Sequence, residues 1–471
     1  MDEHVLPTTA TAATSTSAIS SREVEPREGS QFAIMGSGAS SSSNAQANNN
    51  HMDDGEYENP TAYQGAMALV KSSWINVLVV FIPLGIASHF VWNSTVVFIL
   101  NFIAIIPLAK LLGFATEDIA LRTGEVIGGL LNASFGNAVE LIVSIIALTQ
   151  NLVVVVQASM LGSILSNLLL VLGMCFWFGG IRYQEQVFNQ IVAQTSSSLL
   201  FIATISLLLP AAFYASVGKT ESEEQLTQDI LHISRATSVI LLVIYFAYLF
   251  FQLKTHKDLF LQTPSEARRV SYQTQRTSTL TNVERTMYTG KNTKNQPEDD
   301  DEEEVPQMPF WMSCLALVVI TALVAVCAEF LVSAIEDVVA QWHISETFVG
   351  LILLPIVGNA AEHVTAVTVA MKNKMDLALG VAVGSSMQIA LLVTPLMVII
   401  GWGMDVEMSL LFNVFETAVM LIAVVMVNYL MMDGKSNWLE GFMLFALYIV
   451  LAICFYYYPD AAASELGDVN Q

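Results

Sequence analysis

The 471-residue chain is 54% hydrophobic and only 13% charged, with a formal net charge of −23. Soluble proteins carry about 25% charged residues, so this composition excludes an ordinary soluble protein. Apolar runs long enough to cross a bilayer recur from residue 74 to the C-terminal end, which predicts an all-α polytopic membrane protein. The expected partner is therefore the lipid bilayer, and the acidic balance offers no surface for nucleic acid.

In chain order, residues 1–70 are low in complexity, which is typical of a disordered cytosolic tail. A cytosolic loop, 254–309, contains seven consecutive acids from Glu298 to Glu304, and a short tail, 459–471, ends the chain. The apolar segments between them predict eleven transmembrane helices. Their expected limits are 74–92, 94–113, 126–148, 152–178, 188–214, 234–253, 310–335, 347–371, 376–402, 407–431 and 438–458.

The distribution of basic residues predicts the orientation of these helices. With the N-terminus in the cytosol and eleven crossings, 17 of the 19 Lys and Arg residues fall on the cytosolic side, and only Lys219 and Arg235 fall opposite. Cytosolic segments of membrane proteins carry such an excess of basic residues. The sequence therefore predicts a multi-pass protein with a cytosolic N-terminus and a luminal C-terminus.

An internal repeat divides the apolar region. Gly136-Asn137-Ala138-Val139-Glu140 recurs as Gly358-Asn359-Ala360-Ala361-Glu362, and Gly162-Ser163 recurs as Gly384-Ser385, all at an offset of 222 residues. Residues 136–173 share ten identities in 38 ungapped positions with 358–395. Five predicted crossings separate equivalent helices, so the copies would be inserted upside down relative to each other. We predict an extra N-terminal helix, 71–93, followed by two inverted five-helix repeats, 94–253 and 310–458.

Each copy of the repeat places a glutamate inside an apolar helix, next to a Gly-Asn pair that loosens the helical backbone. A carboxylate at bilayer depth costs about 2.5–3.5 kcal/mol, so it is rarely without a function. Broken helices also expose carbonyl oxygens that can meet an ion. The candidate metal-binding residues are Gly136, Asn137, Glu140, Ser163, Gly358, Asn359, Glu362, Ser385 and Gln388. Their donors are almost all oxygen, which favours Ca²⁺ as a transported substrate and leaves Mn²⁺ open.

The same carboxylates suggest coupling to protons. Two glutamates close together in a medium of low dielectric constant cannot both remain charged without a cation, so cation and protons would compete for one site. His363 follows Glu362 and could assist the proton side, because histidine titrates near neutrality. Glu329, midway along the predicted span 310–335, is a further candidate for the path of the ions. We therefore predict an antiporter that works by alternating access, without an organic cofactor.

The motifs resemble those of the vacuolar cation/proton exchanger family. The resemblance rests on GGLLNASFGNAVELI in the first copy and on GNAAEHVTAV with KNKMDLALGVAVGSSMQIAL in the second, and it spans roughly residues 70–458. It implies that Ca²⁺ moves from the cytosol into an acidic vacuole in exchange for protons. It also implies that Glu140 and Glu362 are the carboxylates that carry cation and proton, with the neighbouring Asn, Ser, Gln and His residues in coordinating or gating roles.

Three other functions remain as alternatives at this stage. A sodium-driven calcium exchanger would need additional cation sites, a cation channel would need no counter-ion, and a Mn²⁺/H⁺ exchanger would use the same oxygen ligands. A membrane-embedded hydrolase is disfavoured, because no aspartyl pair, zinc motif or nucleophile accompanies the glutamates. The oligomeric state is left open, and a homo-oligomer is compatible with the sequence.

Overall fold

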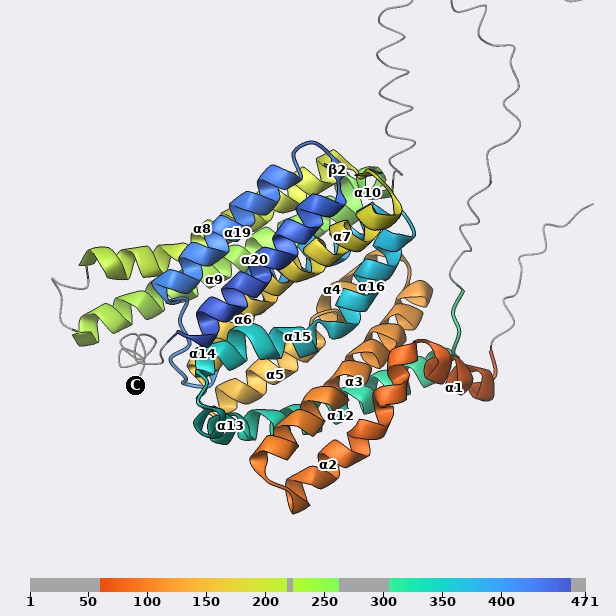
Figure 1. Ribbon diagram of the computed structural model, residues 1–471, viewed down its shortest axis with the longest axis horizontal. Helices are drawn as coiled ribbons and strands as arrows, with labels where there is room; N and C mark the ends of the chain where they lie inside the picture. The colour runs from red at the N-terminus through yellow and green to blue at the C-terminus, as the bar shows by residue number, and fades with distance from the viewer. Residues whose placement is uncertain (1–59, 218–222, 262–304, 459–471) are drawn as a thin grey trace, which may run out of the picture. The chain divides into compact units, whose positions relative to one another are not determined.

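A computed structural model describes residues 60–217, 223–261 and 305–458 (Figure 1). Within these ranges the chain is almost entirely helical, apart from one short antiparallel pair, β1 (Gln186–Val187) with β2 (Lys435–Ser436). Most of the predicted tail 1–70, the acidic run Glu298–Glu304 and the segment 459–471 lie outside the described residues. The prediction of an all-α membrane protein agrees with this architecture.

The first part of the described chain runs from a short surface helix to the helix that ends at Leu261. Its elements are α1 (Ala62–Lys71), η1 (Trp74–Val80), α2 (Phe81–Val91), α3 (Ser94–Thr123), α4 (Glu125–Phe135), α5 (Ala138–Thr149), α6 (Val153–Leu165), η2 (Ser166–Val171), α7 (Leu172–Arg182), α8 (Gln190–Val217), α9 (Glu223–Phe250), η3 (Phe251–Thr255) and α10 (Lys257–Leu261).

The second part is described from residue 305 onward and begins with α12. Its elements are α12 (Phe310–Ser333), α13 (Ile335–Trp342), α14 (Glu346–Phe348), η5 (Val349–Leu353), α15 (Leu354–Gly358), α16 (Ala360–Met371), α17 (Met375–Gln388), η6 (Ile389–Val393), α18 (Thr394–Gly403), α19 (Val414–Leu430) and α20 (Trp438–Tyr456).

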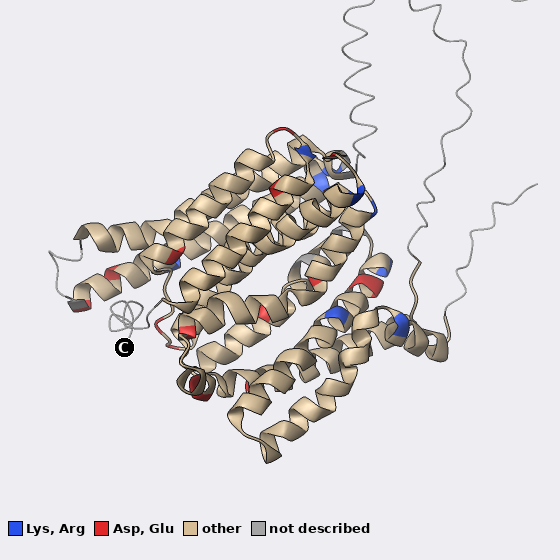
Figure 2. Ribbon diagram, in the orientation of Figure 1, with Lys and Arg blue, Asp and Glu red and all other residues tan. Residues whose placement is uncertain are grey.

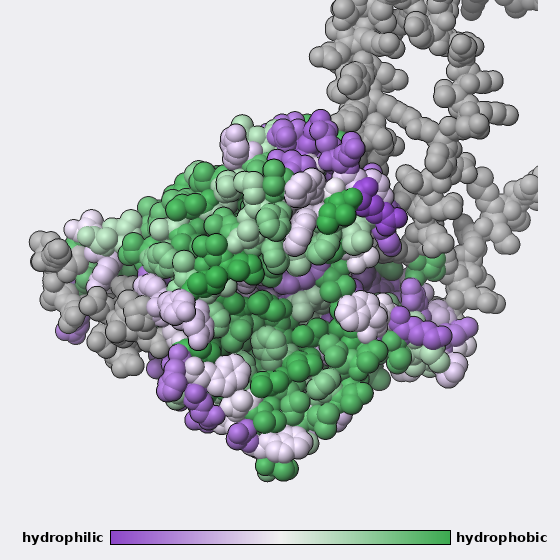
Figure 3. Space-filling view, in the orientation of Figure 1, coloured by the Kyte–Doolittle hydropathy of each residue, from purple (hydrophilic) through white to green (hydrophobic). Residues whose placement is uncertain are grey.

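Eight helices in the described part of the chain are long and apolar enough to cross a membrane, or nine if α13 and the helix after it form one span bent by 116°. Two shorter apolar helices, α5 and α19, fall below that length. Helices occupy all eleven predicted ranges, but the count of eleven crossings remains a prediction. Figure 3 shows a broad hydrophobic surface bounded by hydrophilic residues, as expected for a protein surrounded by lipid.

The 222-residue repeat reappears in local structure. Both Gly-Asn pairs interrupt a helix, between α4 and α5 and between α15 and α16. Asn151 and Asn373, which are equivalent positions, both adopt a left-handed conformation with φ of 61° in the turn before the next helix of their copy, two residues ahead of its first residue. That helix then contains a π-helical turn in each copy, η2 and η6, at matching positions. Such turns are rare and often occur at functional sites.

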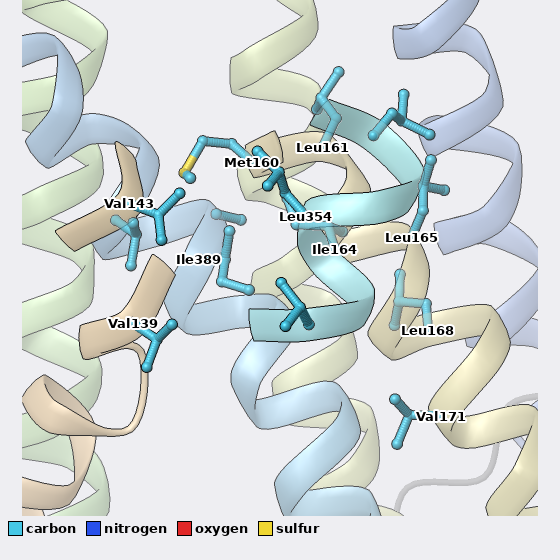
Figure 4. Close-up of a cluster of buried hydrophobic side chains, with 14 of the residues drawn as sticks. Val139, Val143, Met160, Leu161, Ile164, Leu165, Leu168, Val171, Leu354 and Ile389 are labelled. Atoms are coloured by element: carbon cyan, nitrogen blue, oxygen red, sulfur yellow. The ribbon is translucent and has the colours of Figure 1, made fainter. Parts of the chain in front are cut away.

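The long helices that come after α5 and α16 in the two copies form the centre of the bundle. In Val153–Arg182 and Met375–Gly403, 78% and 67% of the most apolar window is buried, against 50% or less in the other six candidate spans. Figure 4 shows their side chains, among them Leu161 and Ile389, packed with residues of α5 and α15. The break motifs therefore lie against the most enclosed helices.

Two predicted boundaries were wrong. The predicted tail extended to residue 70, but α1 begins at Ala62, because Thr61 and Gln64 form a capping box and Gly65 packs against Met308 and Met312. The predicted span 407–431 is helical only from Val414. Residues 408–412 are buried without being helical, and the Gln157 side chain donates hydrogen bonds to the carbonyls of Ser409 (3.0 Å) and Leu411 (3.2 Å), which a helix would use internally.

A buried carboxylate joins α3 to the start of α12. Asp118 is 3% exposed, and its Oδ1 accepts hydrogen bonds from the backbone N–H groups of Gln307 (2.6 Å) and Met308 (3.1 Å). Its Oδ2 accepts one from Ser313 Oγ at 2.7 Å and lies 3.8 Å from Arg122 Nε. The segment from Gln307 to Ser313 is therefore fixed to the last turns of α3.

Asp118→Ala is expected to destabilise the folded protein by about 3 kcal/mol, because it leaves two backbone donors and Arg122 without their acceptor. Thermal unfolding of the purified protein in detergent measures this loss. Glu185→Ala is the matched control, because its ion pair with Lys435 is exposed and contributes little. Equal melting temperatures for the two variants would contradict the anchoring role of Asp118.

Candidate cation site

The two helix breaks meet inside the bundle, each bringing a glutamate in the first turn of the helix that follows it. Glu140 is in the first turn of α5 and Glu362 in the first turn of α16. Figure 1 shows α5 beside α15, which precedes the second break, and the two helices are in contact. A helix N-terminus carries a partial positive charge that favours a carboxylate. Each break therefore both interrupts the backbone and accommodates an acid.

Glu140 reaches from the first copy of the repeat to the break in the second. The side chain is 6% exposed, and its Oε1 would lie 3.0 Å from a Cβ atom at Gly358. Any side chain at Gly358 would therefore crowd this carboxylate. Glu362 follows Gly358 by four residues, and both line the same cavity. The structure thus brings together the two glutamates that sequence analysis singled out.

A chain of hydrogen bonds connects the first break with α17. Asn137 Nδ2 donates to Gln388 Oε1 at 2.7 Å, and Ser385 Oγ donates to Asn137 Oδ1 at 3.2 Å. Ser385 Oγ in turn accepts a hydrogen bond from Asn167 Nδ2 at 3.1 Å. Sequence analysis did not include Asn167, although an asparagine within the apolar run after Ser163 is a signal that could have identified it. These four side chains hold the first break against the second copy.

The equivalent residues of the other copy are not joined in this way. Ser163 and Asn359 are both 0% exposed, and neither the Ser163 hydroxyl nor the Asn359 amide has a hydrogen-bond partner among the described residues. Glu362 Oε2 is also buried without a partner there. A buried polar group without a hydrogen bond costs about 1–3 kcal/mol. These unpartnered neutral and charged oxygens are of the kind that a hard cation such as Ca²⁺ takes as ligands.

A cavity of about 290 Å³ reaches Glu362, whereas Ser163 and Asn359 do not line it. It lies between α3, α4, α16 and α17, and Figure 3 shows a recessed hydrophilic strip across the hydrophobic face. Of the predicted site residues, Gly136, Gly358, Glu362, Ser385 and Gln388 line the cavity, whereas Glu140 lies behind its wall. The wall also includes Lys110, Glu117 and Thr365, which sequence analysis did not assign to the site.

The two residues predicted to assist proton movement have different positions. His363 is buried beside the site, and its Nε2 lies 3.3 Å from Ser166 Oγ in η2. Glu329 is exposed on α12 and accepts a hydrogen bond from Gln150 Nε2 at 3.3 Å. Gln150 follows α5, ten residues after Glu140, which is about 15 Å along a helix. The structure therefore does not bring Glu329 together with the other candidates.

Comparison with known proteins shows the family to which this sequence is similar. The sequence matches the profile of the sodium/calcium exchanger protein family over residues 93–254 and 312–457. It is 45% identical over 395 residues to a vacuolar calcium ion transporter of Schizosaccharomyces pombe, covering 83% of this chain and 87% of that one. It is 41% identical over 411 residues to vacuolar cation/proton exchanger 5 of Arabidopsis thaliana, covering 87% and 86%.

A solved structure agrees with these sequence relatives. The structure of native YfkE matches with a TM-score of 0.64 at 34% identity, covering 82% of this chain and all of that one. The resemblance found in the repeat motifs is therefore confirmed over most of the described residues. With its two interrupted helices, its paired glutamates and these relatives, the chain belongs to the sodium/calcium exchanger protein family, among relatives named as vacuolar calcium and cation/proton exchangers.

Proposed function

We propose that this protein exchanges Ca²⁺ for protons across the vacuolar membrane, moving Ca²⁺ from the cytosol into the acidic lumen. The observation that carries the proposal is the approach of Glu140, in one copy of the repeat, to the break at Gly358 in the other. Two carboxylates neutralise one divalent ion, and in its absence their repulsion favours protonation. The names of the relatives, a vacuolar calcium ion transporter and a Ca²⁺/H⁺ antiporter among them, support the same exchange.

In this mechanism the residues at the breaks bind the cation, and the same carboxylates bind protons on the return. Glu140 and Glu362 supply the charge, while Asn137, Asn359, Ser163, Ser385 and Gln388 supply neutral oxygens, together with the carbonyls freed near Gly136 and Gly358. His363 lies next to Glu362 and would assist proton transfer. Each pH unit of gradient supplies about 1.4 kcal/mol per proton, enough to balance a tenfold concentration ratio.

The orientation of the site follows from the basic residues. Figure 2 shows Lys and Arg gathered mainly at one end of the bundle, near α10, β2 and the end of α7. The cavity is lined by α3 residues from Ala109 to Glu117, in the half of that helix nearer Thr123, and we take it to open toward that same end. By the positive-inside rule this end is cytosolic, so the cavity admits cytosolic Ca²⁺. Inverted repeats at 94–253 and 310–458 would then carry the site between the two sides.

Reconstitution of the purified protein into liposomes with an acidic interior tests the function. Uptake of Ca²⁺ is expected to require the pH gradient, to stop when a protonophore is added, and to be unaffected when sodium is replaced by choline. A series of competing cations, with Mn²⁺ included, measures selectivity. Uptake that requires sodium would favour a sodium-driven exchanger, and uptake that requires no counter-ion would favour a channel; either result would refute the proposal.

A further inference from the structure

Lys110 places a positive charge in the wall of the cavity that leads to a site for a divalent cation. It lies in α3, 13 residues before the helix ends at Thr123, which is about 20 Å along the helix axis. Ionisable residues at such depth are costly and are usually retained for a function. Positive charge at this point opposes the entry of Ca²⁺, so its presence needs an explanation.

The contacts of Lys110 hold its ammonium in the cavity that Glu362 also lines, but they bind it to a neutral group. Lys110 Nζ donates a hydrogen bond to Thr365 Oγ1 at 3.2 Å, and Thr365 Oγ1 is anchored to the carbonyl of Ala361 at 3.0 Å. Thr365 is three residues after Glu362 in α16, so the two side chains share one helix face. Both also line the cavity. In the part of the chain that the structure describes, Lys110 forms no ion pair within 4.0 Å.

We propose that Lys110 is a specificity-determining residue, whose ammonium group competes with the transported ion for electrostatic attraction to the Glu362 carboxylate. This inference rests on the proposed function. The lysine stem is long and flexible, so the ammonium can move between the Thr365 hydroxyl and the carboxylate as the site fills and empties. Lys110 thereby weakens cation binding from the cytosolic side, and Thr365 limits how strongly it does so.

Lys110→Met and Thr365→Val are expected to change the KM for Ca²⁺ in opposite directions. Lys110→Met lowers KM by about tenfold, the scale for a unit charge and a divalent ion a few ångströms apart in a nearly aqueous cavity. Lys110→Arg retains the charge and leaves KM within about twofold of the wild type. Thr365→Val releases the ammonium toward Glu362 and raises KM. The double variant has the KM of Lys110→Met, because Thr365 acts only through Lys110.

Initial rates of uptake at an alkaline external pH, where proton competition is smallest, measure these values. Lys71→Met is the matched control, because it removes the same charge from an exposed position outside the cavity and is expected to leave KM unchanged. An unchanged or raised KM in Lys110→Met, or a loss of uptake in a variant that remains monodisperse, would overturn the assignment. An additive effect in the double variant would also overturn the role given to Thr365.

Calorimetric titration of the purified protein with Ca²⁺ separates this inference from the function on which it rests. If the wild type binds Ca²⁺ but shows no proton-driven uptake, the proposed exchange fails, while tighter binding by Lys110→Met still supports the competition. If uptake behaves as proposed but Lys110→Met and Thr365→Val bind Ca²⁺ with wild-type affinity, the proposed exchange stands and the role of Lys110 is refuted. A monovalent competitor should gain only about the square root of the factor gained by Ca²⁺, since its charge is half as large.

Discussion

Glu140→Gln and Glu362→Gln are each expected to abolish proton-driven Ca²⁺ uptake, with rates at least about a hundredfold below the wild type. The amide keeps the shape of the side chain but removes a negative ligand and a group that can carry a proton. A loss of about 3 kcal/mol in cation binding already corresponds to more than a hundredfold. Because Glu140 lies against Gly358 in the other half of the protein, neither glutamate is expected to substitute for the other.

The matched control is Glu416→Gln. Glu416 is also a buried carboxylate, 4% exposed, but it lies in α19 and does not line the cavity. This variant is expected to retain most of the uptake. Direct binding of Ca²⁺ to each purified variant shows whether the site itself is lost. Undiminished uptake in both Glu140→Gln and Glu362→Gln would contradict the assignment of the site.

The second large effect is expected at Gly162, and the repeat provides its control. A Cβ atom at Gly162 would lie 2.2 Å from the carbonyl oxygen of Leu351, a backbone atom that cannot rotate away. Gly162→Ala must therefore separate α6 from η5, where the two copies of the repeat are packed. At the equivalent Gly384, a Cβ atom would meet nothing within 4 Å.

We expect Gly162→Ala to cost more than about 3 kcal/mol, enough to prevent recovery of folded protein. Gly384→Ala should be neutral or stabilising by up to about 1 kcal/mol, because alanine favours a helix over glycine. The yield of monodisperse protein and its melting temperature in detergent measure the difference. Similar behaviour of the two variants would show that the close approach at Leu351 does not limit folding.

The sequence predicted the helix breaks well, because a glycine followed by asparagine weakens a helix wherever it occurs. It also predicted that Asn137 and Ser385 belong to one site, although they are 248 residues apart, because the repeat relates each to a partner in the other copy. Local signals of this kind do not depend on tertiary packing. The same reasoning identified Glu140 and Glu362, since an intramembrane acid is conspicuous in an apolar helix.

Other features depend on packing that a single sequence does not display. Lys110 was counted with the basic residues of the cytosolic side, because charge statistics do not reveal that α3 turns it toward a cavity. Glu329 satisfied the criterion of an acid within a span, yet its partner Gln150 caps the end of α5 opposite to Glu140. The segment before Val414 is apolar enough for a helix, but Gln157 holds its backbone in another conformation.

The hydrogen bond from Ser385 to Asn137 has no counterpart between Ser163 and Asn359. The two copies of the repeat are therefore in different conformations around their helix breaks. If the halves exchange conformations when the cavity opens to the opposite side, the Ser385–Asn137 hydrogen bond should break and an equivalent bond between Ser163 and Asn359 should form. A cysteine in place of Ser163 would then become shielded from a thiol reagent under the conditions that uncover a cysteine in place of Ser385. Simultaneous shielding of both cysteines would mean that the halves do not alternate. If they do alternate, the Ser–Asn hydrogen bond breaks at one helix break and forms at the other each time the site changes sides.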